Sequence, residues 1–290
     1  MQRKFLHPKG PEFSRIVAGA WRWNNVGTDV VDRLVQTAVD CGITSFDNAD
    51  IYGDYGNEKI FGGAMRKMPG IRKDIQIITK CGIRLMSGHQ PKTWIKHYDT
   101  TKEHILDSVD NSLKNMRTDY IDLLLIHRPD PMMDPEEVSE AFGLLRQSGK
   151  VLHFGVSNFT SSQFEMLQSY LPFSLVTNQV EIALSKLESL FDGTLDTMLR
   201  FKACPMAGSP LGGGRLMEGG SPLWAKREKY KATEPQMALA WLLKHPSGIF
   251  PVIGTTQPDR ILESARAMNI DLDRQDWFEM LKVATGRDVP

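Results

Sequence analysis

The sequence predicts an α/β protein that folds as a closed (β/α)8 barrel, with a short hairpin before the first strand and an extra helix after the last repeat. Short apolar runs alternate with longer segments of helical period, and eight of each can be counted. The first run lacks the glycine fingerprint that opens a doubly wound sheet. The 290 residues suit a single barrel domain spanning residues 1–290, because barrels of this class run to roughly 250 residues.

The predicted strands are short apolar runs of the kind that lie buried in a parallel sheet. In chain order they cover residues 15–20, 43–47, 75–80, 121–127, 153–158, 175–180, 204–209 and 250–254. The helices between them cover residues 30–42, 58–67, 101–116, 135–149, 160–171, 195–201, 234–245 and 259–268. Gly42 and Gly149 stand where a helix should end, and Pro135 where one should begin. Residues 5–13 resemble a hairpin, and residues 271–286 the additional helix.

The composition favours a small-molecule partner over a polymer or a membrane. Lysine plus arginine balance aspartate plus glutamate at 35 each, so no overall field attracts nucleic acid or anionic lipid. The basic run at residues 226–231 is interpreted as a solvated face. No segment reaches the roughly 18 apolar residues of a membrane span. We expect a monomer or small homo-oligomer.

Cysteine and histidine usage indicates a reducing, cytoplasmic location and no metal. Cys41, Cys81 and Cys204 are far apart, odd in number and outside any CxxC pair. No HxH pair lies near the first strand, and no other His or Cys cluster replaces it. A metal hydrolase is therefore not favoured.

Polar residues collect where the predicted strands end, which is the rim on which barrels of this class carry their chemistry. Each has an ordinary structural explanation when taken alone, such as a helix cap for an aspartate or a surface position for a lysine. Together they would bring an acid, an ammonium, an imidazole and amides to one rim. These residues are Asp47, Lys80, His127, Ser157, Asn158 and Gln179.

Tyr52 follows Asp47 by five residues in the stretch FDNADIYGDYGNE, and Lys80 is on the next predicted strand. If the loop that carries the phenol folds back over the barrel, the ammonium can approach both groups. A close cation typically lowers the pKa of an acid by roughly 1 to 3 units, which would bring Tyr52 toward the pKa of a useful general acid. Asp47 would keep Lys80 charged, and His127 would hold a substrate oxygen.

These motifs, with LLLIHRPDP, SGKVLHFGVSNFTSSQF and TNQVEI, resemble the aldo/keto reductase superfamily and its bacterial YdhF-like branch from about residue 12 onward. Asp47, Tyr52, Lys80 and His127 match the catalytic tetrad of that family. The resemblance implies hydride transfer between a nicotinamide and a carbonyl compound, an aldehyde or ketone, with Tyr52 as proton donor. It also implies NADP(H) as the preferred cofactor, with NAD(H) possible.

The resemblance further suggests cofactor contacts spread over five loops. Glycine-rich backbone amides favour phosphate, although a run such as GGGR is weak evidence alone. Arg260 lies just inside a predicted helix and could meet a 2′-phosphate. The suggested contacts are Gly19, Ala20, Trp21, Asp47, Ser157, Asn158, Gln179, Ser209, Leu211, Gly213, Gly254, Thr255, Thr256, Arg260 and Ser264.

The chain departs from the family pattern at several cofactor positions. Gly208 replaces the Tyr or Trp that commonly stacks on the nicotinamide, which predicts weaker cofactor retention. Gly254 replaces a phosphate-binding lysine of some members, and Ser264 a frequent adenine-contacting asparagine. The segment 216–231 is short, which predicts a reduced loop over the cofactor.

The substrate is weakly encoded, and two other functions stay open. Trp21, Trp23 and Trp94 are candidates for an apolar wall beside Tyr52, and ordinary packing explains each of them equally well. Arg84, His89 and Arg128 could contact a polar substrate, but solvated loop charges are the more common explanation. A lysine at a strand end can also form a Schiff base, as in a lyase. A third possibility is a nicotinamide-binding redox sensor with slow turnover, which Gly208 makes less remote.

Overall fold

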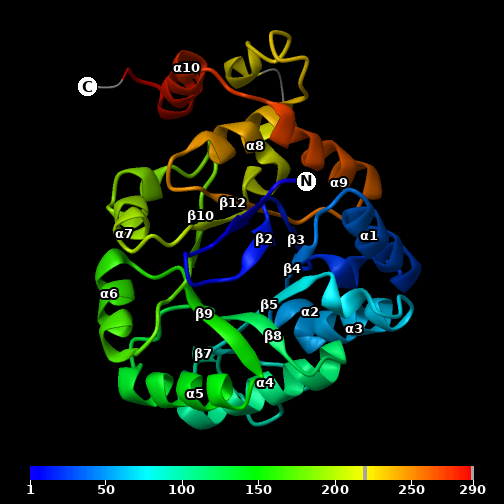
Figure 1. Cartoon of the computed structure of the whole chain (residues 1–290), viewed down its shortest axis with the longest axis vertical. Coiled ribbons are helices and arrows are strands. Elements are labelled where there is room, and N and C mark those ends of the chain that lie inside the picture. Colours follow the sequence, from blue (N-terminus) through cyan, green and yellow to red (C-terminus); the bar gives the residue numbers. More distant parts are fainter. Residues whose placement is uncertain (218–220, 289–290) are drawn as a thin grey trace.

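The computed structural model describes residues 1–217 and 221–288, and eight parallel strands in it form a closed barrel ringed by helices (Figure 1). Each strand pairs with its sequence neighbours, and the last barrel strand pairs with the first. The predicted fold is therefore confirmed. The barrel strands are β3 (Val17–Gly19), β4 (Ser45–Asp47), β5 (Gln76–Cys81), β8 (Ile121–Ile126), β9 (Val151–Ser157), β10 (Asn178–Glu181), β11 (Met206–Gly208) and β12 (Phe250–Ile253).

Helices follow the strands as predicted, apart from the short α2, which was not predicted, and their bounds mostly differ by one or two residues. They are α1 (Thr28–Asp40), α2 (Tyr52–Tyr55), α3 (Asn57–Arg66), α4 (Lys102–Met116), α5 (Pro135–Gln147), α6 (Ser161–Tyr170), α7 (Thr194–Arg200), α8 (Glu234–Lys244), α9 (Pro258–Ala265) and α10 (Arg274–Thr285). Gly42 and Gly149 both adopt positive φ just beyond a helix end, as expected for residues that stop a helix. Helix α10 is the predicted additional helix.

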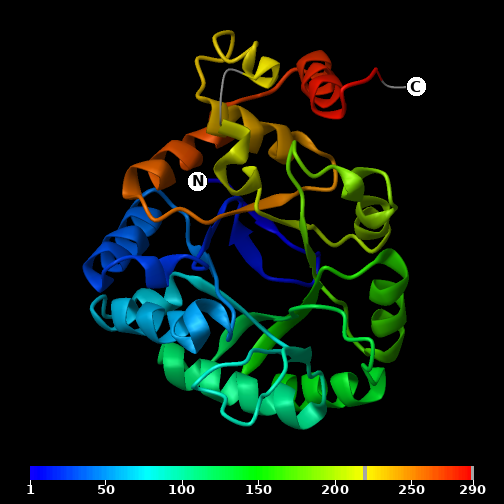
Figure 2. The ribbon, with the colours of Figure 1, turned by 180° about the vertical axis from the view of Figure 1, so that it is seen from behind.

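The predicted hairpin closes the amino-terminal end of the barrel. Strands β1 (Arg3–Phe5) and β2 (Glu12–Ser14) pair antiparallel and lie across the barrel in Figure 1. Leu6 and Phe13 are fully buried and pack with Val17, Ile78 and other residues of the barrel interior. The opposite end, seen in Figure 2, carries the loops that follow the strands.

Short elements within the loops were not predicted, because they contain too few residues for a periodic pattern. Strands β6 (Ile83–Arg84) and β7 (His97–Tyr98) form a small antiparallel pair in the loop after β5. Six 3-10 turns complete the described elements: η1 (Trp23–Asn25), η2 (Ile71–Lys73), η3 (Glu188–Leu190), η4 (Gly212–Met217), η5 (Pro222–Trp224) and η6 (Arg266–Asn269).

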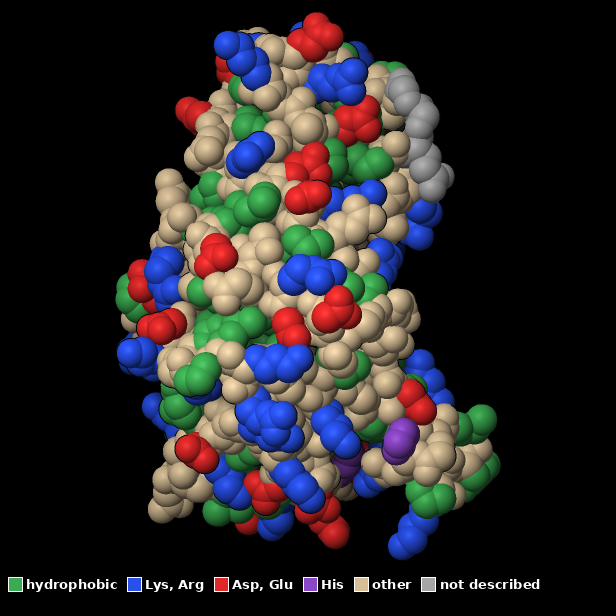
Figure 3. Space-filling model, turned by 90° about the vertical axis from the view of Figure 1, so that its right-hand side faces the viewer, with side chains coloured by type: hydrophobic (Ala, Val, Ile, Leu, Met, Phe, Trp, Pro, Cys, Tyr) green, Lys and Arg blue, Asp and Glu red, His purple; other side chains and the backbone are tan. Residues whose placement is uncertain are grey.

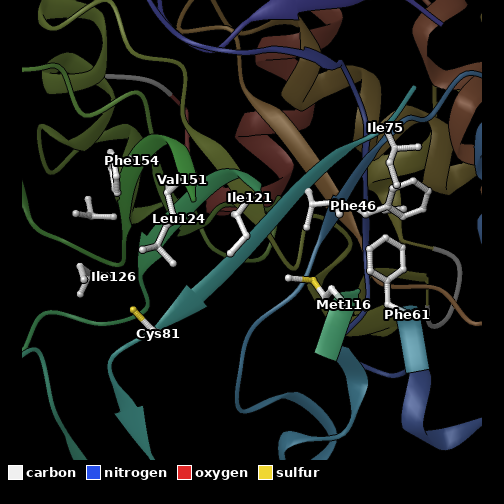
Figure 4. Close-up of a cluster of buried hydrophobic side chains, with 14 of the residues drawn as sticks. Phe46, Phe61, Ile75, Cys81, Met116, Ile121, Leu124, Ile126, Val151 and Phe154 are labelled. Atoms are coloured by element: carbon white, nitrogen blue, oxygen red, sulfur yellow. The ribbon is translucent and has the colours of Figure 1, made fainter. Parts of the chain in front are cut away.

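The largest core fills the space between the barrel wall and the helices. Figure 4 shows part of it around β5 and β8, where Phe46 and Phe61 lie 5.3 Å apart between ring centroids. A second core joins α8, α10 and η5 through Trp241, Leu223 and Trp224. Burial of this apolar surface is the main force that holds helices against strands.

The outer surface mixes charges of both signs, as the face in Figure 3 shows. This agrees with the formal net charge of zero. Among the described residues, no helix is long and apolar enough to cross a membrane.

Helix α3 approaches α4 closely through Gly62. A Cβ at this position would lie 2.2 Å from the carbonyl oxygen of Asn115 and 2.9 Å from the Cα of Met116, whereas a Cβ on Gly63 would meet nothing within 4 Å. This contact fixes the helix that follows Tyr52, so it helps to place the loop at the open end of the barrel.

We predict opposite effects for alanine at these two adjacent glycines. Gly62→Ala should lower the free energy of unfolding by about 1–3 kcal/mol, because the α4 backbone must move. Gly63→Ala should raise it by about 0.5–1 kcal/mol, because it only removes backbone freedom. Urea denaturation measures both. Equal effects of the two substitutions would contradict the close approach.

Candidate active site

The ammonium of Lys80 joins three oxygen atoms at the open end of the barrel. Its Nζ donates hydrogen bonds to Asp47 Oδ2 at 2.7 Å, to the carbonyl oxygen of Asn48 at 2.8 Å and to the Tyr52 hydroxyl at 3.2 Å. The Lys80 side chain has no exposed surface, and that of Asp47 is 4% exposed. Lys80 therefore contacts both Asp47 and Tyr52, as expected from the sequence.

Strand geometry brings the acid and the lysine together. Asp47 ends β4 and Lys80 is near the end of β5, and these neighbouring parallel strands place Asp47 opposite Ile78. The second carboxylate oxygen, Asp47 Oδ1, accepts a hydrogen bond from Gln179 Nε2 of β10 at 3.0 Å. Asp47 is thus held from two sides of the barrel, and Gln179 is drawn into the same network.

The turn after Tyr52 aims the phenol over the barrel. Gly53, Asp54 and Tyr55 all have positive φ, and a Cβ on Gly53 would lie 2.0 Å from the side-chain oxygen of Asn57. The same Asn57 donates to the carbonyl oxygens of Ala20 and Trp21 at 2.8 and 3.2 Å, which ties this turn to the loop after β3. Only glycine fits at position 53, which explains why glycine follows the tyrosine.

His127 follows β8 and faces Tyr52. Its backbone N–H donates to the carbonyl oxygen of Cys81 at 2.8 Å, and its ring meets the phenol ring edge-on with 5.8 Å between centroids. Burial lowers the pKa of His127 well below its ordinary value, and Lys80, Arg128 and Lys96 lower it further. The imidazole is therefore neutral at pH 7 and able to donate one N–H to an oxygen in the cavity.

A cavity of about 1370 Å³ opens beside these groups and extends across the rim. Asp47, Tyr52 and His127 line one part, and the loops after β3, β9, β10, β11 and β12 contribute most of the rest. Trp21 is 58% exposed and meets Tyr52 edge-on at 4.8 Å between centroids, so it forms a wall next to the phenol. The space is large enough for an extended ligand and a smaller one beside it.

Comparisons with known proteins place this geometry in a family. The profile of the aldo/keto reductase family matches residues 15–284. The chain belongs to the aldo/keto reductase family. It is 45% identical to the oxidoreductase YdhF of Escherichia coli (strain K12) and 44% identical to a 6-dehydroglucose reductase of Agrobacterium fabrum, over the full length of all three chains. It is also 45% identical to the uncharacterized oxidoreductase YcsN of Bacillus subtilis, over 96% of this chain and 97% of the relative.

A solved structure agrees with this assignment. The thermostable aldo-keto reductase Tm1743, in complex with the inhibitor epalrestat, superimposes with a TM-score of 0.85 at 26% identity, over 98% of this chain and 100% of Tm1743. The protein is accordingly an oxidoreductase, and aldo/keto reductases use nicotinamide cofactors. The resemblance to the YdhF-like branch is confirmed.

Most residues expected to contact the cofactor line the cavity of this aldo/keto reductase. Two of them, Ala20 and Thr256, do not line the cavity. Ala20 is fully buried. Those that do are Gly19, Trp21, Asp47, Ser157, Asn158, Gln179, Ser209, Leu211, Gly213, Gly254, Thr255, Arg260 and Ser264.

The departures from the family pattern have a visible structural setting. Gly208 ends β11 and lines the cavity, and a Cβ there would meet only the Val180 backbone, at 3.6 Å or more. The backbone at this position would therefore accept a Cβ without a clash. Within the segment 216–231, residues 218–220 lie outside the described residues, while Met217 and Arg227 line the cavity.

Some of the candidate substrate contacts line the cavity, and others do not. Trp23 is 2% exposed and packs against Phe46 and Phe61, so it belongs to the core. Trp94 is 82% exposed and does not line the cavity. Arg84 is paired with Asp99 at 3.0 Å. His89 does not line the cavity, whereas Trp21 and Arg128 do.

Several charged residues that line the cavity were not predicted from the sequence, among them Arg22, Arg227 and Glu234. Arg22 follows Trp21 directly, so its place after a barrel strand was the available clue. Arg227 and Glu234 are far from any strand end in sequence, and only the folded chain brings them to the rim.

One electrostatic expectation was wrong. Burial raises the pKa of Tyr52, and Lys80 offsets this only in part, so the net pKa lies above the ordinary value for a tyrosine. For Lys80, burial lowers the pKa, but Asp47 and Tyr52 raise it by more. The site therefore holds a charged Lys80 beside a protonated Tyr52. Burial of Tyr52 destabilises its phenolate form, and the Lys80 ammonium, which is already paired with Asp47, stabilises that form by a smaller amount.

We predict that breaking the buried ion pair will be costly for stability. Lys80→Met leaves Asp47 as a buried charge without its cation and should lower the free energy of unfolding by roughly 3–5 kcal/mol. The double variant Lys80→Met, Asp47→Asn should recover much of this loss. Chemical denaturation at neutral pH measures both, and a double variant less stable than the single one would refute the explanation.

The lowered pKa of His127 predicts a loss of stability in acid. The unfolded chain binds a proton on this residue below about pH 6.5, whereas the folded chain does so only at lower pH, so stability falls as pH decreases from 6.5. The contribution is at most about 1.4 kcal/mol per pH unit. The His127→Gln variant should therefore lose less stability than the wild type between pH 7.5 and 5, measured by denaturant titration. Parallel losses in the two proteins would contradict this.

Proposed function

We propose that this aldo/keto reductase reduces an aldehyde or ketone to an alcohol, with NADPH as hydride source and Tyr52 as proton donor. The observation that carries the proposal is the hydrogen bond between the Lys80 ammonium and the Tyr52 hydroxyl in the wall of the cavity. When bound, the nicotinamide would supply the hydride for the carbonyl carbon, and the Tyr52 phenol would give its proton to the carbonyl oxygen.

The residues of the cavity are suited to a nicotinamide dinucleotide. Ser157 ends β9, Asn158 follows it, and Gln179 lies beside Ser157 on β10, which gives an amide- and hydroxyl-lined region near Asp47. Gly212, Gly213 and Gly214 all have positive φ and form a tight turn, in which the N–H groups of Gly212 and Gly214 donate to the carbonyl oxygens of Ser209 and Leu211 at 2.8 and 2.9 Å. Arg22 Nη2 and Arg215 Nη1 both come within 4 Å of where a Cβ on Gly213 would be. A pyrophosphate could approach this turn closely, because it has no side chains, and would find two guanidinium groups there.

Preference for NADPH is supported by Arg260. This residue lines the cavity near the start of α9, where a guanidinium and the helix N-terminus both favour a phosphate. Gly254 also lines the cavity and provides no lysine. We therefore infer that Arg260 binds the 2′-phosphate and makes NADPH the preferred cofactor. Because Gly254 adds no second positive charge, NADH stays usable as the weaker cofactor.

The protein groups have separate roles in the step. Neutral His127 would donate an N–H to the carbonyl oxygen and orient it toward Tyr52. Lys80 stabilises the phenolate that remains after proton transfer, because an ammonium 3.2 Å away lowers its energy in a site that excludes water. Asp47 keeps this lysine charged and in place. Tyr52 then regains its proton from solvent.

The first substrates to test are carbonyl compounds with several hydroxyl groups. Two relatives, 44% and 35% identical to this chain, are named 6-dehydroglucose reductase. Trp21 offers an exposed ring face beside Tyr52, and Arg128 offers hydrogen-bond donors next to His127. An oxidised sugar could use both, since aromatic rings pack against C–H groups and guanidinium groups bind hydroxyls.

A nicotinamide-binding sensor is the second candidate. Gly208 leaves the ring position over the nicotinamide open, and one relative at 28% identity is named a putative voltage-gated potassium channel subunit beta. Tight nucleotide binding with negligible turnover over a panel of aldehydes would favour this role. The Schiff-base lyase is disfavoured, because Lys80 is fully enclosed and held in its charged form by Asp47. Borohydride trapping on Lys80 would reverse that ranking.

We predict that Tyr52→Phe lowers kcat by about 10²–10⁴-fold, the usual contribution of a general acid, while NADPH binding stays largely intact. The matched control is Tyr55→Phe, since Tyr55 lies in the same turn but its hydroxyl accepts a hydrogen bond from the Leu85 backbone. Steady-state rates and fluorescence titration with NADPH and NADH measure the outcome. Unchanged turnover in Tyr52→Phe would refute the proposed proton donor.

A further inference from the structure

A buried acid, Asp50, lies two residues before Tyr52 and is not used by the proposed proton transfer. Its carboxyl group points toward α4, on the side of the barrel where α2, α3 and α4 follow one another (Figure 1). Ser108 of α4 donates a hydrogen bond to Asp50 Oδ2 at 3.1 Å. The other oxygen, Oδ1, is buried without a hydrogen-bond partner among the described residues. An ionised carboxylate is costly there, because a buried charge is stable only when it is paired or well hydrogen-bonded.

The backbone of Asp50 fastens the turn of Tyr52 to β5. The N–H of Asp50 donates to the carbonyl oxygen of Lys80 at 3.0 Å, and the N–H of Tyr52 donates to that of Ala49 at 3.1 Å. With Ser108 bound to its side chain, Asp50 joins β5 to α4. This junction comes directly before the phenol whose hydroxyl lies 3.2 Å from the Lys80 ammonium.

A second buried acid, Glu58 of α3, lies close to Asp50 and has more hydrogen-bond donors. Glu58 is 1% exposed, and its Oε1 accepts the hydroxyl of Thr79 at 2.6 Å. Burial raises the pKa of Glu58, and hydrogen bonds from Thr79, Ser112 and Asn115 lower it in part. Hydrogen bonds of this kind stabilise a negative charge, so Glu58 is the better placed of the two acids to ionise.

Asp50 has less support for a charge. Burial raises the pKa of Asp50 well above its ordinary value, and the neighbouring Glu58 raises it further. Ser108 and Lys80 lower this pKa by smaller amounts. Of two adjacent buried acids, the one with fewer donors keeps its proton, and here that acid is Asp50.

The groups that face Asp50 offer little positive charge to compensate an ionised form. Among them Lys80 is the only cation, and it is already paired with Asp47 at 2.7 Å. A negative charge on Asp50 also raises the pKa of Tyr52. The titratable groups around Asp50 are Glu58 on α3, Lys80 and Cys81 on β5, and Tyr52 and Tyr55 on α2, while α4 contributes the uncharged Ser108.

We propose that Asp50 is a positioning residue for the proton donor, and that it holds the Tyr52 turn between β5 and α4 as a neutral carboxylic acid. Neutrality suits the reaction, because Tyr52 becomes a phenolate when it gives up its proton. A carboxylate two residues away would oppose that charge in a site that excludes water. The inference rests on the proposed function, since it assigns the proton step to Tyr52.

The charge of Asp50 is tested without a substrate, by urea denaturation of the full-length wild type and of Asp50→Asn. Unfolded Asp50 releases its proton above about pH 3.9, whereas the folded chain keeps it to higher pH. Folding then takes up a proton, so this residue makes the wild type less stable as the pH rises. Asparagine has the same shape and stays neutral, so Asp50→Asn should gain stability over the wild type between about pH 5 and 8. A constant or shrinking difference would overturn the neutral acid.

Steady-state kinetics test the positioning role. Asp50→Asn should leave kcat at pH 7 nearly unchanged and extend activity to higher pH, because asparagine cannot ionise. Asp50→Ala and Ser108→Ala should each lower kcat roughly tenfold with little change in KM, because the Tyr52 turn is less firmly held. If Asp50→Asn loses as much activity as Asp50→Ala, the neutral form is not the active one and the proposal is wrong.

The matched control is Asp107→Asn, which removes an exposed carboxyl of α4 next to Ser108 in the sequence. It should alter neither kcat nor the pH dependence of stability. If the wild type reduces no carbonyl compound with NADPH, the proposed function fails and the positioning role with it, while denaturation still decides the charge of Asp50. If the wild type is active and both alanine variants match it, only the further inference fails. Should Asp50→Ala not fold, Ser108→Ala alone decides.

Discussion

The buried ion pair between Lys80 and Asp47 is the interaction on which the open end of the barrel depends. An ammonium without exposed surface is tolerated only when its hydrogen bonds and its charge are met, and here one carboxylate, one carbonyl and one phenol meet them. Gln179 then fixes the same carboxylate from β10. This single charge network joins strands β4, β5 and β10. Strand β10 is not next to β4 or β5 in the sheet, and closure of the barrel brings it across the interior to the same carboxylate.

The electrostatics of this network result from two opposing effects on Tyr52. The ammonium favours phenolate, but burial favours the neutral phenol, and burial has the larger effect. A protonated tyrosine beside a charged lysine is a suitable resting state for a proton donor, because the stabilisation of negative charge is already in place before the proton leaves. His127 fits the same scheme, since low water access and nearby cations keep its ring neutral.

The sequence predicted those features that come from local periodicity and from the rule that parallel strands end at one rim. Alternating runs identified the barrel strands and helices, and strand ends identified Asp47, Lys80, Ser157 and Gln179. Features set by tertiary contacts escaped prediction. Arg227 lines the cavity although it is far from any strand end in the sequence, and Trp23 could not be assigned to core or wall until its packing on Phe46 was known. The pKa of Tyr52 was misjudged because burial cannot be read from spacing.

Trp241 of the second core stacks on Trp277 of α10 with an interplanar angle of 5°, and this pair has an experimental consequence of its own. Two nearly parallel indoles in van der Waals range couple their strong far-ultraviolet transitions, so the pair adds an exciton feature to the circular dichroism of the helices and strands. Detachment of α10 from α8 would remove that feature and would also expose Trp241, now 1% exposed, to water, which shifts its fluorescence to longer wavelength. The enzyme therefore carries an intrinsic optical reporter for the docking of its last helix, and no added dye is needed to follow it.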